Sequence, residues 1–134
     1  MRSTLTKIKT RYVESDQMGI IHHSNYLIYM EQARLDWLDV LGFSYAKMES
    51  QKVLLPVYQI DIKYKKPIKF GEEITVKTIL KDIPTTRVLF EYEIINFKGD
   101  ICATADLTLV FTDGNTFRPT KPLPDFLAAC KRLF

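Results

Sequence analysis

The apolar positions of this chain follow a helical period in one segment. Between Ser24 and Leu41 they recur every three or four residues, at Tyr26, Met30, Ala33, Trp37 and Leu41. This spacing predicts one long amphipathic helix. Ser24 is placed to cap its N-terminus, and Gly42 is placed to end it in the left-handed conformation that side chains resist.

A period of two runs through the other apolar segments and predicts strands. The first segment covers 5–14, where Ile8, Thr10 and Tyr12 alternate with charged residues. Longer stretches follow at 58–64, 74–78, 88–94 and 101–111, and they are expected to form an antiparallel meander. The tail after Pro124 is expected to add a short helix.

The expected helix and strands have matching lengths. The segment 24–41 would be about 27 Å long as a helix, and strands of about ten residues are roughly 33 Å long. Ile28 and Tyr29 widen the apolar arc of the helix, while Ala103 and Ala105 leave room for close approach. These features predict an α+β fold in which an antiparallel sheet wraps around one long central helix, with residues 1–134 forming a single domain.

Composition supports a folded cytoplasmic protein. Hydrophobic residues make up 46% and charged residues 26% of the 134 positions, close to the averages for globular proteins. No apolar run approaches the roughly 18 residues of a membrane span, and the N-terminus lacks the apolar core of a secretory signal. Cys102 and Cys130 form no CxxC pair, so free thiols are expected rather than a disulfide framework or a zinc ribbon.

The charge distribution argues against nucleic-acid binding. The net charge is +3, and most lysines are interleaved with acids instead of forming a dense basic stripe. The run KYKK, residues 63–66, is the one small basic cluster. It is explained either as a solvated strand face or as a contact for a phosphate-bearing ligand.

The segment DQMGIIHHSNYLIYMEQAR, residues 16–34, places titratable residues where the long helix begins. Free amides at a helix N-terminus can polarise a carbonyl and hold an oxyanion, and Asp16 beside them can act as nucleophile or deprotonate a water. The alternative for Asp16 is a turn acid that satisfies local amides. Gly19 is explained by a turn that needs positive φ.

Other polar residues of this segment have ordinary explanations. His22 and His23 are adjacent, so their side chains diverge and seldom chelate one metal; no metal site is predicted. Glu31 and Arg34 are three apart on the helix and are expected to form an ion pair. Asn25 is an alternative N-terminal cap.

The same segment, with the strand layout that follows it, resembles the hotdog-fold acyl-CoA thioesterases of the 4-hydroxybenzoyl-CoA thioesterase-like family. The resemblance covers nearly the whole chain and includes the stretch LPVYQIDIKYKKPIKFGEEITVKT, residues 55–78. Its signature runs through Asp16, Gly19, His23, Tyr26, Glu31 and Arg34.

The resemblance implies roles for several residues. Asp16 matches the catalytic carboxylate of the family, and the backbone N–H of His23 matches the amide that polarises the thioester carbonyl. The His23 side chain is a second candidate, because a histidine occupies this place in the closest bacterial branch. Gly19 and Tyr26 are expected at the substrate site, where Tyr26 shapes the acyl pocket.

The function that the resemblance implies is hydrolysis of an acyl-CoA to a free acid and coenzyme A, without a metal or redox cofactor. It also implies homodimers that join their sheets, often paired into homotetramers. The alternatives are a noncatalytic acyl-CoA or acyl-carrier binding protein of the same fold, and a dehydratase, which would carry its acid on the helix instead of before it.

Two groups of side chains are candidates for substrate contact. The basic residues Lys63, Lys65, Lys66 and Arg87 are expected to include those that bind the coenzyme A phosphates. Tyr26, Tyr29, Tyr58 and Tyr64 are explained either as core residues or as the lining of an aromatic acyl pocket, and the core is favoured.

Overall fold

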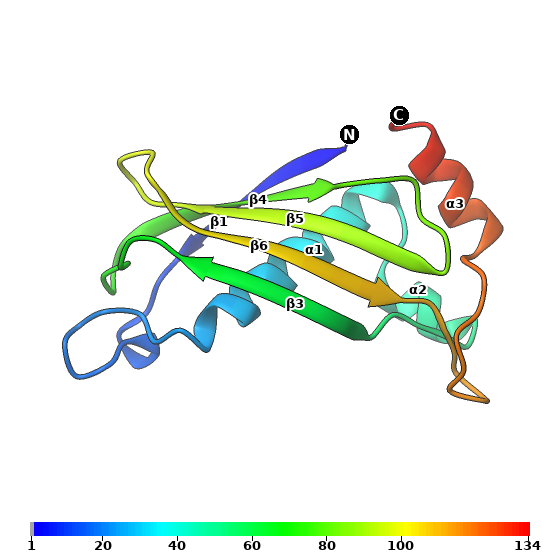
Figure 1. The fold of residues 1–134 in the computed structure, drawn as a ribbon, viewed down its shortest axis with the longest axis horizontal. Helices are drawn as coiled ribbons and strands as arrows, with labels where there is room; N and C mark the ends of the chain where they lie inside the picture. Colours follow the sequence, from blue (N-terminus) through cyan, green and yellow to red (C-terminus); the bar gives the residue numbers. More distant parts are fainter. Residues whose placement is uncertain (1) are drawn as a thin grey trace.

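The computed structural model describes residues 2–134 and shows one antiparallel sheet crossed by one long helix (Figure 1). The strands of this sheet are β1 (Ser3–Lys9), β3 (Val57–Tyr64), β4 (Glu73–Leu80), β5 (Arg87–Ile95) and β6 (Ile101–Val110). The helices are α1 (Asn25–Leu41), α2 (Tyr45–Ser50), α3 (Pro124–Lys131) and the short 3₁₀ helix η1 (Tyr12–Glu14). Strands β2 (Val53–Leu54) and β7 (Thr112–Asp113) pair with each other.

The order of the sheet is β1-β4-β5-β6-β3, with every neighbouring pair antiparallel. The predicted strands are confirmed, but a simple meander is wrong. Strands β4, β5 and β6 form a meander, whereas β3 crosses to pair with β6 and β1 pairs with β4. Alternation of apolar residues specifies which face of a strand is buried, and it does not specify which strand lies beside it. Strands β1 and β3 are therefore the two edges of the sheet.

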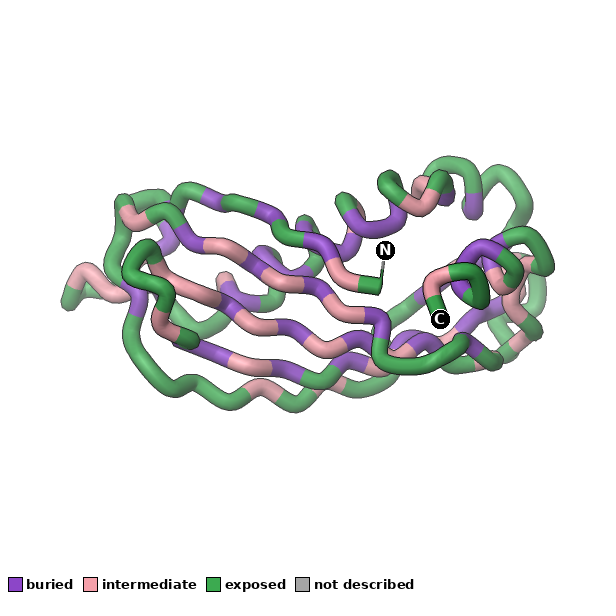
Figure 2. Tube along the Cα trace, turned by 90° about the horizontal axis from the view of Figure 1, so that it is seen from above, coloured by how far each residue is buried: buried purple, intermediate pink, exposed green. Residues whose placement is uncertain are grey.

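Helix α1 lies along the inner face of the sheet and forms the centre of the core. Trp37 is 1% exposed, and its ring meets Phe90 edge-on, with 5.0 Å between the ring centroids. Figure 2 shows burial alternating along the strands, as expected for a sheet with one covered face. Met30 lies against Ala103 and Ala105, so the small residues of β6 do face the helix.

The two ends of α1 differ from each other in how they are formed. Gly42 ends the helix with φ +93°, as predicted. Ser24 does not cap the other end: its own backbone is helical, and its side chain makes no capping bond. Instead, the ring nitrogen Nδ1 of His22 accepts the Ser24 N–H at 3.2 Å and lies 2.8 Å from the Ser24 hydroxyl.

Other boundaries also depart from the pattern. Strand β1 ends at Lys9, and the predicted continuation to 14 is wrong, because residues 12–14 form η1. At this junction the Thr10 hydroxyl donates to the Glu72 carbonyl at 2.9 Å. The expected helix after Pro124 is α3. Elements α2, β2 and β7 were not predicted.

Cys102 and Cys130 are both buried free thiols, which confirms the sequence prediction. No helix in residues 2–134 is long and apolar enough to cross a membrane.

Candidate functional site

Residues 15–21 form a tight loop at the end of the sheet, between η1 and α1. Its two arms meet at an isolated bridge between Ser15 and Ile21, and the Asp16 N–H donates to the Ile20 carbonyl at 2.7 Å. Gly19 closes the turn with φ +76°, a conformation that favours glycine. The turn explanation of Gly19 is confirmed, and its place in the loop keeps it beside Asp16.

Asp16 is exposed, and its two carboxylate oxygens differ. Oδ1 accepts the backbone N–H groups of Met18, at 2.8 Å, and Ile20, at 3.2 Å. No hydrogen bond to Oδ2 is found within residues 2–134. Asp16 is thus the local turn acid that the sequence allowed as an alternative, yet one oxygen stays available for chemistry.

The backbone N–H of His23 makes no hydrogen bond within residues 2–134, whereas the backbone N–H groups of its neighbours do. The His22 N–H donates to the Glu14 carbonyl, and the Ser24 N–H donates to the His22 ring. The backbone N–H groups of Asn25 and Tyr26 donate to the carbonyls of His22 and His23, respectively. For the His23 N–H, the described part of the chain offers no hydrogen-bond acceptor. This amide lies at the positive end of α1, where it can donate to a ligand oxygen.

A groove of about 340 Å³ is lined by both Asp16 and His23. Its lining residues are Asp16, Ile20, Ile21, His22, His23, Tyr26, Tyr64, Lys65, Lys66 and Pro67. The Tyr64 hydroxyl donates to the His23 carbonyl at 3.3 Å, and its ring meets that of Tyr26 edge-on at 4.9 Å between centroids. Burial raises the pKa of Tyr26 to about 12, so this phenol stays neutral.

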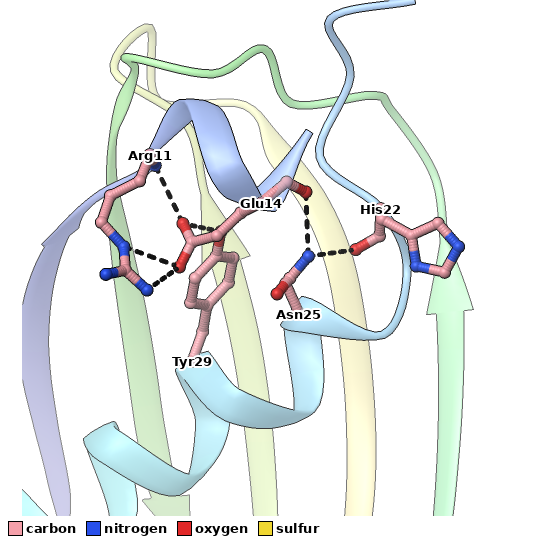
Figure 3. A network of polar contacts seen from close by, with 5 residues as sticks. All are labelled: Arg11, Glu14, His22, Asn25 and Tyr29. Carbon is pink, nitrogen blue, oxygen red and sulfur yellow. Dashed lines mark hydrogen bonds and ion pairs between the residues drawn. The ribbon is translucent and has the colours of Figure 1, made fainter. Parts of the chain in front are cut away.

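Glu14 ties the loop to the helix and was missed in the sequence. Figure 3 shows its carboxylate accepting the Tyr29 hydroxyl, at 2.8 Å, and the backbone N–H of Arg11, at 2.9 Å, with the Arg11 guanidinium 3.1 Å away. Its backbone carbonyl accepts the Asn25 side-chain amide at 2.9 Å and the His22 N–H at 2.9 Å. The Ile21–His22 peptide, where the Asp16 loop ends, and the first residue of α1 are therefore both anchored to Glu14.

The sequence carried a faint signal for this anchor. Glu14 has the same parity as Ile8, Thr10 and Tyr12, so the period-two pattern placed an acid on the buried side. An acid at a buried position requires hydrogen-bond donors. Asn25 is also reassigned, since its side chain bonds backwards to Glu14 instead of capping the helix.

Burial raises the pKa of the Glu14 carboxyl, but bonds from the Arg11 N–H, the Tyr29 hydroxyl and the Arg11 guanidinium outweigh it, so the pKa lies below its ordinary value of 4.5. A folded-state pKa below the unfolded one stabilises the fold above the unfolded pKa, and this stabilisation is lost as pH falls through the folded pKa.

We expect Glu14→Gln to lower the free energy of unfolding at pH 7 by about 1–3 kcal/mol, because it removes charged acceptors from buried donors. The deficit should begin to shrink below about pH 4.5, where the carboxyl of the unfolded wild type takes up a proton, and it should shrink further as pH falls through the lower folded pKa. Urea unfolding from pH 7 to pH 3 measures the loss of unfolding free energy and its dependence on pH. Glu49→Gln, at an exposed glutamate, is the control. A deficit that is constant over this range would contradict the assignment.

The structure separates the four basic candidates. Lys65 and Lys66 line the groove, and Lys66 also pairs with Asp100 at 3.5 Å. Lys63 lies beside Thr104 of β6 in the strand register. Its side chain is on the outer face of the sheet, opposite the apolar row of β3. Arg87 lies over the Tyr58 ring at the other end of the sheet, so its expected place near the site is wrong within one chain. Phosphate binding by these residues stays a prediction.

The four tyrosines divide into two pairs. Tyr26 and Tyr29 are 3% and 1% exposed and belong to the core, whereas Tyr58 and Tyr64 are 61% and 49% exposed. The expected ion pair between Glu31 and Arg34 is wrong: no such contact is found within residues 2–134, because Arg34 turns inward toward two tyrosine hydroxyls.

Comparison with known proteins identifies the family of this chain. A family model described as the thioesterase-like superfamily matches residues 11–130. The chain is 37% identical to a provisionally named acyl-CoA thioesterase, YneP, of Bacillus subtilis (strain 168), over 98% of each chain. It is 23% identical to the acyl-CoA thioester hydrolase YbgC of Escherichia coli O6:H1, over 96% of this chain and 97% of that protein.

A crystal structure of DHNA-CoA thioesterase from Staphylococcus aureus superposes with a TM-score of 0.94 and 38% sequence identity, covering 99% of this chain and 91% of the other. The sheet wrapped on a central helix is therefore the hotdog fold of these relatives.

Proposed function

The chain belongs to the thioesterase-like superfamily and is a thioester hydrolase, and we propose that it hydrolyses acyl-CoA with Asp16 as the catalytic carboxylate. One observation carries this proposal: the same groove is lined by Asp16, whose Oδ2 accepts no hydrogen bond within residues 2–134, and by His23, whose backbone N–H donates none there. The names of its relatives support acyl-CoA as the substrate.

The His23 N–H is proposed to polarise the thioester. A carbonyl oxygen seated on this amide receives a hydrogen bond that strengthens as the oxygen becomes an oxyanion, and the dipole of α1 adds to the effect. The Tyr64 hydroxyl and the Glu14 anchor hold the flanking peptide groups, so the donor does not need to reorganise during the reaction.

Asp16 is proposed to act from beside this carbonyl, by one of two routes. Its free oxygen attacks the thioester carbon, or it takes a proton from a water that attacks instead. In the first route the coenzyme A thiolate leaves, and water then hydrolyses the mixed anhydride between the acyl group and Asp16. In the second route the attacked thioester expels the thiolate, which takes the proton that Asp16 removed from water. Both routes end with a free acid and coenzyme A. The bonds to Oδ1 hold the carboxylate in place, and Gly19 and Tyr26 shape the loop and the acyl side of the groove.

The side chain of His23 remains a second candidate for contact with water or substrate. It is exposed at the groove, and its ring faces Tyr64 edge-on with centroids 6.2 Å apart. The His22 ring is instead occupied by Ser24. This difference favours His23 over its neighbour.

Release of free thiol from a panel of short, medium, long and aromatic acyl-CoAs tests the proposed function. We expect turnover of at least one ester. A protein that binds these esters with no turnover of any would be a noncatalytic binding protein, contrary to the proposal.

Lys65 and Lys66 are proposed to bind the coenzyme A phosphates, since both are exposed at the groove. The double variant Lys65→Ala, Lys66→Ala should raise KM for acyl-CoA by about 3- to 30-fold, with kcat nearly unchanged, because the phosphates bind alike in ground and transition states. KM for an acyl-pantetheine, which lacks the nucleotide, should not change.

Lys63→Ala, Arg87→Ala is the comparison variant for this prediction, because these two residues lie outside the groove of their own chain and only a second copy brings Arg87 toward a groove. An equal KM increase with both variants would mean that the phosphates also reach the outer residues. No increase with either would place the phosphates elsewhere.

We also propose that two copies join through β3, as a homodimer or within a homotetramer. This strand is an edge of the sheet, and it leaves Val57, Tyr58 and Tyr64 about half exposed or more. An exposed edge with apolar side chains is a template for pairing with another strand. Antiparallel pairing of two β3 strands would be two-fold symmetric and would extend the sheet across both copies.

A further inference from the structure

Arg34 is a buried cation without an acidic partner. The residue is 6% exposed, and no carboxylate within residues 2–134 lies within 4.0 Å of it. Its contacts are the hydroxyls of Tyr45, at 3.4 Å from Nε, and Tyr92, at 3.4 Å from Nη1. Both distances are long for a hydrogen bond.

Some N–H donors of the Arg34 guanidinium have no acceptor within residues 2–134. Arginine carries five N–H donors and stays charged, and Nη2 has no hydrogen-bond partner in the described part of the chain. Buried arginines are nearly always paired, since an uncompensated buried charge is strongly destabilising. Glu31, one turn away on α1, is exposed and leaves Arg34 unpaired. The unbonded Nη2 is not fully buried, and Arg34 lines a groove, so this donor is open to an acceptor that a ligand brings.

A groove of about 470 Å³ opens beside Arg34. Its lining residues are Glu31, Arg34, Tyr45, Glu49, Val53, Leu54, Leu55, Pro56 and Val57. One wall is apolar, Glu31 and Glu49 contribute acidic groups, and Arg34 is the single cation among the lining residues. Such a groove suits an apolar group that carries an oxyanion into contact with Arg34.

Within one chain the Arg34 groove is far from Asp16. In the proposed pair of chains it lies close to the catalytic groove of the other copy. It lies at the Val57 end of β3, and the catalytic groove lies at the Tyr64 end, about 23 Å away along the strand. In an antiparallel, two-fold pair of β3 strands, the Val57 end of one copy lies opposite the Tyr64 end of the other. The Arg34 groove of one copy then continues the catalytic groove of its partner.

Resting on the proposed function and its β3 pairing, we propose that the Arg34 groove is a specificity subsite that binds an oxyanion at the far end of the acyl group. The oxyanion is a carboxylate or a phenolate. Arg34 donates to it, Val53 to Val57 cover the carbon chain or ring, and the thioester reaches Asp16 of the other copy.

Matched pairs of esters distinguish these two sources of the oxyanion. Glutaryl-CoA and pentanoyl-CoA differ by a terminal carboxylate, and 4-hydroxybenzoyl-CoA and benzoyl-CoA differ by one phenolic oxygen. In at least one pair, wild type should prefer the oxygenated ester by about 10- to 100-fold in kcat/KM, the value of a hydrogen bond to a charged group.

Arg34→Met should abolish this preference while changing kcat/KM for the apolar ester less than threefold. Arg34→Lys, which keeps the charge but loses the planar fork, should retain part of it. Arg118→Met, at an exposed arginine outside both grooves, is the control and should keep the wild-type ratio. Thermal unfolding of each variant is measured alongside.

Several outcomes would overturn the inference. They are a wild-type ratio near one in both pairs, a ratio unchanged by Arg34→Met, and an equal loss on both esters with a lowered Tm, which would make Arg34 a structural residue. Dissociation of the oligomer by Arg34→Met and by Glu31→Gln alike would assign the guanidinium to Glu31 of a second copy.

Failure of the proposed function gives a different result. If wild type hydrolyses none of the four esters, calorimetric binding of the same esters to wild type and Arg34→Met replaces kinetics. A binding preference lost in the variant would support the Arg34 subsite without turnover, and equal binding would overturn it.

Discussion

Asp16→Asn is expected to lower kcat by about 10²–10⁴-fold, the usual contribution of a positioned acid or base, while the protein folds normally. The asparagine oxygen can still accept the N–H groups of Met18 and Ile20, so the loop keeps its shape. The group that is lost is the free oxygen that attacks the thioester or takes a proton from water. Initial rates of thiol release on the best ester, with circular dichroism for folding, measure the effect.

Asp39→Asn is the matched control, because Asp39 is an exposed acid near the opposite end of α1. It should retain the wild-type rate. If Asp16→Asn keeps more than half of the wild-type kcat, Asp16 is a turn residue and the catalytic carboxylate lies elsewhere.

Val57→Asp is expected to produce a monomer with kcat/KM lowered by about a hundredfold or more. An acid at this edge would be buried in the interface without a charged partner, which opposes pairing of the two strands. Loss of the partner removes one side of the composite groove, where even small misplacement of a substrate costs about 10²-fold. Light scattering at the assay concentration gives the oligomeric state, and thiol release gives the activity.

Leu5→Asp controls for an acid on an edge strand. Leu5 is 67% exposed on β1, the opposite edge, and Val57 is 50% exposed on β3. Leu5→Asp should remain oligomeric and active. A fully active monomer of Val57→Asp would refute the proposal that the partner completes the site.

Several elements could be predicted from the sequence because their signals are local. The spacing from Tyr26 to Leu41 predicted the start of α1 to within one residue, and Gly42 predicted its end. Both signals are local, because helix periodicity and left-handed caps depend on neighbouring residues alone. The inward rows of β4, β5 and β6 were equally clear, whereas the predicted row on β3 is at most half-buried. Asp16 and Gly19 stood out because they lie just before the helix.

Other features depended on residues distant in sequence. The exchange of β3 to the far side of β6 follows from global packing, which strand patterns do not encode. Arg34 left the predicted pair with Glu31 because Tyr45 and Tyr92, from other elements, offer hydroxyls on its buried side. Lys65 and Arg87 look equivalent as cations, and only the strand register separates them by the length of the sheet.

The sequence by itself determined the elements, the sheet wrapped on a helix and the residue types at the helix start, because hydrophobic period, glycine and acid placement act over a few residues. The tertiary structure alone decided which groups at that site are free. Oδ1 of Asp16 accepts two hydrogen bonds, and Oδ2 accepts none within residues 2–134. The Ser24 N–H donates to the His22 ring, whereas the His23 N–H has no acceptor within the same residues. Such availability depends on where every competing donor and acceptor lies, and folding settles those positions together.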